Sequence, residues 1–264
     1  METQNNSYGT VGISGTLPSD EGSGLHNYLF NIYVAPADVC EEIRKQKTRV
    51  IHWLIPLIIA ITMGIIHNIF IFNQPVIIQK VKEQQEQQVL AMVKSGAIPD
   101  SQAEDALARL EKYSGPKFLK LSRSILSAVW TTLGFFVAAL VLWLLGSKVY
   151  KADLDYSRAM EFAGIALMIP ALNFLAGMFL IGAVGKEHIN FGPSVILSEF
   201  DQKNALHSLL STIDLMTLWH LGVLSQGLAY FGQIPLKKAI YWMGGLWVFY
   251  KTFTILVGLA IMRV

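Results

Sequence analysis

Five long apolar runs alternate with polar segments along this 264-residue chain. Each run has about the 20 residues that a helix needs to cross a hydrocarbon core of about 30 Å. The runs cover residues 51–72, 125–146, 162–184, 206–231 and 239–262. This pattern predicts an all-α polytopic membrane protein whose membrane domain, residues 51–264, is a bundle of five transmembrane helices.

A polar insertion, residues 74–120, separates the first two runs. Its first half has a composition typical of helices, and Gly96 stands where a glycine commonly ends one. A second short helix is expected to follow and to stop at Gly115-Pro116. The insertion therefore predicts a helical hairpin outside the membrane. Two roles are open for it: a spacer, or a docking surface for a partner membrane protein.

Residues 26–50 predict an amphipathic helix ahead of the first run. Pro36 suits the first helical turn, where its missing N–H costs nothing, and Val39 and Ile43 fall on one side. We expect this helix to rest in the lipid headgroup layer. Residues 1–25 are polar and rich in Gly and Ser, which predicts a disordered tail.

The composition supports a membrane protein and excludes several other classes. Hydrophobic residues make up 53% of the chain and charged residues only 15%, whereas soluble domains carry about 25% charged residues. A net charge of +2 without a basic stripe does not indicate a nucleic-acid partner. A single cysteine, Cys40, allows neither a disulfide framework nor a cysteine-based metal site.

Basic residues in the short loops indicate the orientation. The side that carries the N-terminus has Arg44, Lys45, Lys47, Arg49, Lys148, Lys151, Arg158, Lys237 and Lys238. The opposite side has fewer basic residues in short loops, although the long insertion adds more. The balance favours a cytoplasmic N-terminus.

Asp214 and Lys251 are the candidate residues for chemistry, because ionisable side chains inside a membrane usually face the bundle interior and pair. Their runs are joined by a short bridge and should be antiparallel, and the two depths differ by roughly 5 Å. We expect an intramembrane ion pair or a water-linked pair. It would lock two helices together or relay a proton or ion; alternatively, Lys251 snorkels to the surface without contact.

Pro170 and Asn173 in the third run are a second candidate feature. Proline frees a carbonyl one turn earlier, and an asparagine can hydrogen-bond to it or to a neighbouring helix. This combination predicts a packing kink or, less often, a binding site. The sequence shows no nucleophile–base arrangement, no phosphate-binding glycine loop and no paired metal-ligand spacing. We therefore expect no catalytic residue, no metal site and no cofactor.

Several motifs resemble the Yip1 family of membrane proteins. They are the turn that begins Pro36-Ala37-Asp38-Val39, the break Ile169-Pro170-Ala171-Leu172, the segment from Asp214 to Trp219, and Trp247. The resemblance implies a five-span fold with a cytosolic N-terminus and, in eukaryotic members, a role in membrane traffic with small GTPases. The short N-terminal tail offers little surface for that role, which favours a prokaryotic member in the inner membrane.

Two functions remain open at this stage. The first is a non-enzymatic scaffold that binds other membrane proteins or shapes the bilayer. The alternative is a small transporter or channel that uses the Asp214 and Lys251 charges.

Overall fold

The computed structural model describes residues 24–184, 190–196 and 204–261, and within these ranges every regular element is helical. The predicted tail, residues 1–25, lies almost entirely outside the described residues. The α-helices in the described ranges are α1 (Leu25–Asn31), α2 (Pro36–Lys45), α3 (Ile51–Ile71), α4 (Pro75–Lys94), α5 (Ala103–Tyr113), α6 (Pro116–Trp143), α7 (Tyr156–Ala166), α8 (Met168–Val184), α9 (Ala205–Thr212), α10 (Leu215–Phe231) and α11 (Leu236–Ile261).

Four helical segments of the described chain are long and apolar enough to cross a membrane, and the number is five if a bent pair of helices forms one span. The four segments are α3, α6 with its π-helical end (Leu144–Val149), α7 with α8, and α11. The bent pair is α9 with α10. The predicted all-α polytopic architecture is therefore confirmed.

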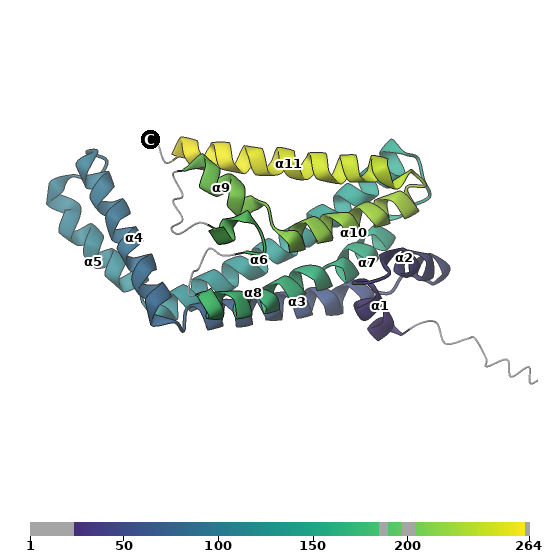
Figure 1. Ribbon diagram of the computed structural model, residues 1–264, viewed down its shortest axis with the longest axis horizontal. Helices are drawn as coiled ribbons and strands as arrows, with labels where there is room; N and C mark the ends of the chain where they lie inside the picture. The colour runs from purple at the N-terminus through teal and green to yellow at the C-terminus, as the bar shows by residue number, and fades with distance from the viewer. Residues whose placement is uncertain (1–23, 185–189, 197–203, 262–264) are drawn as a thin grey trace, which may run out of the picture.

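The chain passes back and forth along the long axis of the molecule (Figure 1). One end holds α1, α2 and the starts of α3, α7 and α11. The opposite end holds the start of α6, the end of α8, α9 and the hairpin formed by α4 and α5. We call these the N-terminal end and the hairpin end.

Close helix contacts set the position of α3 in the bundle, where it packs against α6, α7 and α8. At Gly164 on α7 an added Cβ would lie 2.5 Å from the Trp53 Cα, so the two backbones approach as closely as a glycine allows. The Trp53 ring stacks on Phe135 of α6 with 5.5 Å between ring centroids. The N-terminal half of α3 is thereby fixed between α6 and α7.

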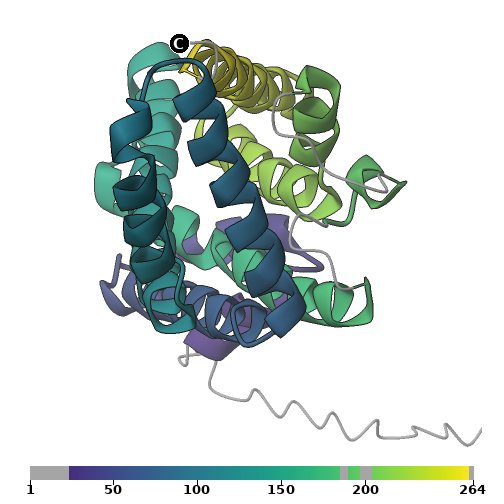
Figure 2. The same cartoon turned by 90° about the vertical axis from the view of Figure 1, so that its left-hand side faces the viewer.

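The α4–α5 hairpin projects from the bundle (Figure 1), and its two helices run side by side across the hairpin end in Figure 2. Gly96 adopts a φ of 77°, the left-handed conformation expected of a glycine that ends α4. A small apolar cluster anchors the base of the hairpin on the bundle: Ile71, Phe72, Ile77, Val81, Leu119 and Ile181. The predicted hairpin therefore exists, although α6 begins at Pro116 and leads directly into the second span.

The segment before the first span differs from the predicted single interfacial helix. It forms two short helices, and Pro36 occupies the first turn of α2 as expected. Val39, Cys40 and Ile43 are buried, because α2 packs against α7 and α10. The apolar face of α2 therefore packs on the protein bundle, and a position of this segment at the level of the headgroups stays a prediction.

Two of the predicted spans are interrupted. The third breaks at Leu167, between α7 and α8, which places Pro170 in the first turn of α8 where its missing N–H costs little. The fourth, predicted as continuous over 206–231, bends by 53° between α9 and α10. Asp214 stands at this bend, and its side chain caps the N-terminus of α10.

Candidate functional site

A group of buried charged side chains lies at the N-terminal end of the bundle. Because α3 and α7 both start at this end, His52 in the first turn of α3 lies beside Glu161 in α7. Both side chains are almost completely buried, with 4% and 1% of their surface exposed. Such burial of a carboxylate is costly unless the group is paired and hydrogen-bonded.

Glu161 accepts hydrogen bonds from two cationic or potentially cationic groups. His52 Nδ1 bonds to its Oε1, and Arg158 Nη1 lies 3.3 Å from its Oε2. Arg158 is one turn earlier on the same helix, so its guanidinium reaches back along α7 to the carboxylate. We call these three residues the His52–Arg158–Glu161 cluster.

Arg158 also connects this cluster to α2. Its guanidinium donates to the backbone carbonyls of Ile43 and Gln46, and the Nη2–O distance to Gln46 is 2.7 Å. These carbonyls lie at the end of α2, where a cation is electrostatically favoured, and the Ile43 carbonyl also accepts a hydrogen bond from the Gln46 N–H. A planar guanidinium with five donors can serve a carboxylate and two carbonyls at once.

Tyr28 of α1 completes the surroundings of His52. The two rings meet edge to face, with 5.2 Å between centroids and 85° between planes. Burial raises the pKa of Tyr28, and the carboxylates of Glu42 and Glu161 act in the same direction. The phenol therefore stays neutral. Together with Tyr28, the cluster joins four helices: α1, α2, α3 and α7.

The chemistry of this arrangement is that of a structural tie. The carboxylate is satisfied by an arginine and a histidine, so it offers no free basic oxygen to a substrate. Within the described residues, no group of three His, Cys, Asp or Glu side chains could hold a metal ion.

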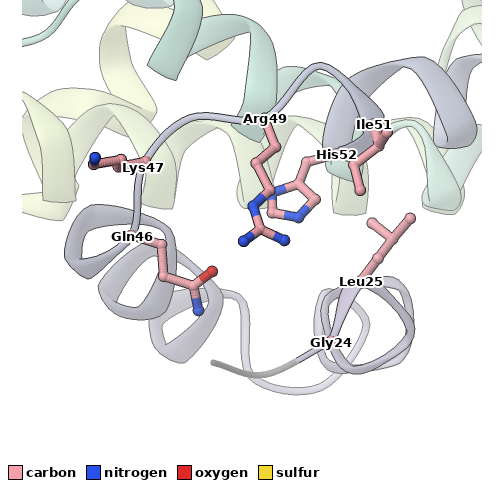
Figure 3. Close-up of a pocket in the computed structure, with 7 residues that line it drawn as sticks. All are labelled: Gly24, Leu25, Gln46, Lys47, Arg49, Ile51 and His52. Atoms are coloured by element: carbon pink, nitrogen blue, oxygen red, sulfur yellow. The ribbon is translucent and has the colours of Figure 1, made fainter. Parts of the chain in front are cut away.

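A pocket of about 300 Å³ opens beside this cluster (Figure 3). Its walls come from the start of α1, the α2–α3 linker and the start of α3: Gly24, Leu25, Gln46, Lys47, Arg49, Ile51 and His52. Figure 3 shows the Arg49 guanidinium and the His52 ring pointing into the same space, with the Gln46 amide facing it. We call it the α1–α3 pocket.

The structure places Asp214 and Lys251 in separate surroundings. Asp214 is buried, and its carboxylate accepts hydrogen bonds from the backbone N–H groups of Phe191 and Thr217 at 3.1 and 2.9 Å. The Lys251 ammonium lies over the ring of Tyr250, 5.7 Å from its centroid. The ion pairs of the described residues do not include a direct contact between Asp214 and Lys251. The directly bonded form of the predicted pair is thus not formed, because the bend uses the carboxylate as a helix cap; the water-linked form stays a prediction.

The other residues singled out from the sequence occupy packing positions. Asn173 is half-buried on α8, near Pro170. Trp219 of α10 packs against Tyr33, with 5.8 Å between ring centroids. Trp247 of α11 is half-buried. These positions bring none of the residues into the His52–Arg158–Glu161 cluster.

The fold, its apolar exterior and its alternating spans define a multi-pass integral membrane protein. The chain matches the model of the Yip1 domain over residues 30–259. Because this match covers most of the chain, the protein belongs to the Yip1 family, a family of non-enzymatic membrane proteins. No curated protein and no solved structure matched the chain.

Proposed function

We propose that this protein is a non-enzymatic membrane organiser that docks a second membrane protein on its α4–α5 hairpin. The observation that carries this proposal is the open groove between the two helices of the hairpin, which has a volume of about 590 Å³. Its lining comprises Lys82, Glu86 and Leu90 of α4 and Leu107, Ala108, Leu110 and Glu111 of α5, with Ser114 at one end.

The lining of this groove fits an amphipathic helix. Leucines from both helices supply an apolar surface, and Lys82, Glu86 and Glu111 supply charges of both signs around it. A helix that lays its apolar face into such a groove gains hydrophobic contact and keeps its polar face in water. The partner we propose is therefore an amphipathic helix belonging to another membrane protein.

The hairpin is held rigidly enough to present this groove. Ser114 donates a hydrogen bond of 2.7 Å to Gln85 across the two helices. The apolar cluster at the base, which includes Phe72 and Leu119, fixes the hairpin to α3, α6 and α8. A preformed surface loses less conformational entropy on binding than a flexible one, which supports docking over a simple spacer.

The location that we propose follows from the charge distribution and the resemblance discussed above. The basic loops lie at the N-terminal end, which favours a cytoplasmic N-terminus. In the inner membrane of a prokaryotic cell, the hairpin would then face the periplasm. Transport is less well supported, because Asp214 hydrogen-bonds to backbone N–H groups and so is not a free group along a polar path.

The test compares two substitutions on α4 in the full-length protein, purified in mild detergent. Leu90→Arg places a charge in the groove, whereas Met92→Arg places one at a similarly exposed position outside it; these side chains are 47% and 42% exposed. We expect mass spectrometry to find one near-stoichiometric membrane-protein partner with the wild type and Met92→Arg, and to lose it with Leu90→Arg. A partner retained by Leu90→Arg, or no near-stoichiometric partner at all, would refute docking in the groove.

A further inference from the structure

The α1–α3 pocket has the charge of an anion-binding site. Two of its seven lining residues, Lys47 and Arg49, carry a positive charge, His52 can carry one, and none of the seven is acidic. The pocket also lies at the N-terminus of α3, a helix of 21 residues. The dipole of a helix this long favours negative charge at its start.

The orientation of the His52 ring supplies an independent sign of a ligand. His52 is tied to Glu161 through Nδ1, so Nε2 is the nitrogen left for another group. The hydrogen bond of the His52 ring within the described residues is the one through Nδ1, and only 4% of the side chain is exposed. Figure 3 shows the ring turned toward the pocket beside the Arg49 guanidinium. Nε2 is a donor in the protonated ring and an acceptor in the neutral ring, so it can bind a phosphate oxygen or a hydroxyl group.

The position of the pocket, at the start of the first membrane span, favours a lipid over a soluble ion as its ligand. Ile51 lines the pocket and is also the first residue of the first membrane span. Val50, Ile51 and Leu54 beside it are 60%, 46% and 38% exposed, which places an apolar surface next to the charged groups. A phospholipid meets both features, since its phosphate can reach the pocket while its acyl chains cover the apolar side chains.

We propose that the α1–α3 pocket binds the phosphodiester headgroup of an anionic phospholipid, with Arg49 on the phosphate and His52 Nε2 on a phosphate oxygen or headgroup hydroxyl, while Lys47 at the rim adds positive charge. Arg49 is the principal contact, because its planar fork can bind two phosphate oxygens at once. Gln46 supplies a further amide from the opposite side of the pocket. This proposal does not depend on the hairpin, which lies at the other end of the molecule.

The test measures lipid binding to the delipidated full-length protein by native mass spectrometry. The probes are phosphatidylglycerol and phosphatidylcholine. The test protein is a double variant that carries both Lys47→Gln and Arg49→Gln. The matched control is Arg44→Gln with Lys45→Gln, which removes one arginine and one lysine from exposed positions of the neighbouring helix. We expect phosphatidylglycerol to bind the wild type more tightly than phosphatidylcholine, by about tenfold. The double variant at Lys47 and Arg49 should lose this preference for phosphatidylglycerol, and the control double variant at Arg44 and Lys45 should keep it.

Three results would overturn the proposal. They are equal binding of the two lipids, an equal loss of the preference in both double variants, and displacement of phosphatidylglycerol by millimolar glycerol phosphate. The second would mean that the basic surface attracts anionic lipid without a pocket, and the third that the ligand is a soluble phosphate ester. Unfolding midpoints without lipid check that each variant is folded, and no partner protein enters the measurement.

Discussion

His52 and Glu161, 109 positions apart in the sequence, join the start of α3 to α7 through a hydrogen bond between two buried side chains. Arg158 extends this connection to the end of α2 through two backbone carbonyls. The three residues therefore fix the N-terminal helices on the membrane bundle. They also hold one wall of the α1–α3 pocket in place.

Replacing the buried carboxylate should destabilise the protein strongly. Glu161→Gln leaves Arg158 without its counter-charge, and breaking a buried pair in this way costs about 3–5 kcal/mol. We expect a clearly lower midpoint of thermal unfolding in detergent. Glu41→Gln is the control, since it removes an exposed partner of Lys45 and should leave the midpoint unchanged. Equal midpoints for the wild type and Glu161→Gln would show that the cluster is not a structural tie.

The single cysteine should report whether α2 is docked. Burial raises the pKa of the Cys40 thiol, and the side chain is inaccessible, so a maleimide should label it only after unfolding in SDS. Arg158→Lys keeps the charge but loses the fork that binds α2. If the lost bonds are worth about 1.5 kcal/mol, labelling of the native variant should be about tenfold faster. Unchanged labelling in Arg158→Lys would mean that apolar packing alone docks α2.

The features that could be predicted from the sequence are local or compositional. Apolar runs of sufficient length reveal spans because the bilayer thickness fixes the length required. Pro36 and Gly96 mark a helix start and a helix end because their backbone geometry is restricted in one case and unusually free in the other. The bend at Asp214 could also have been predicted from a local signal, because aspartate is a preferred N-cap residue. The interpretation of Asp214 as a charged residue in the middle of a span left this capping role out.

The His52–Arg158–Glu161 cluster was missed because each residue looked ordinary by itself. Glu161 stands immediately before the third apolar run, so the hydrophobic pattern does not mark it as part of the bundle. A usable signal existed, since alternating spans bring the starts of the first and third runs to the same membrane face. A histidine and a carboxylate at those two starts, with Arg158 one turn away, could have been paired on that basis.

Gly164 should not tolerate a methyl group. An added Cβ would lie 2.4 Å from the Trp53 Cβ and 2.5 Å from its Cα, so α3 and α7 would have to separate. Gly164→Ala should lower the unfolding midpoint, with overpacking costing about 1–3 kcal/mol. Gly134→Ala on α6 is the control, because nothing lies within 4 Å of its added Cβ. A Gly164→Ala protein as stable as Gly134→Ala would contradict this close helix contact.

Tyr33 should link stability to pH in the alkaline range. Its hydroxyl donates to the Met168 carbonyl at 2.7 Å, just after the break between α7 and α8, and burial raises its pKa to about 12. The unfolded side chain ionises near its ordinary value of 10.0, so stability should fall as pH rises from 10 toward 12. At neutral pH the Tyr33→Phe variant should be about 1 kcal/mol less stable than the wild type. This difference in stability should narrow as the pH rises from 10 toward 12, because only the wild type loses stability by ionising Tyr33. Chemical denaturation of both proteins at several pH values measures this difference, and a constant deficit would contradict it.

Asp214 should act as a helix cap and be energetically independent of Lys251. Asp214→Ala removes the acceptor of the Thr217 and Phe191 N–H groups and should cost about 1–2 kcal/mol, whereas Asp214→Asn retains a capping oxygen and should cost little. In a double-mutant cycle of Asp214→Ala with Lys251→Met, the two effects on unfolding free energy should add to within about 0.5 kcal/mol. A coupling well above that value would restore the interaction predicted from the sequence, most simply through water. It would also return Asp214 and Lys251 to consideration as a polar path through the bundle.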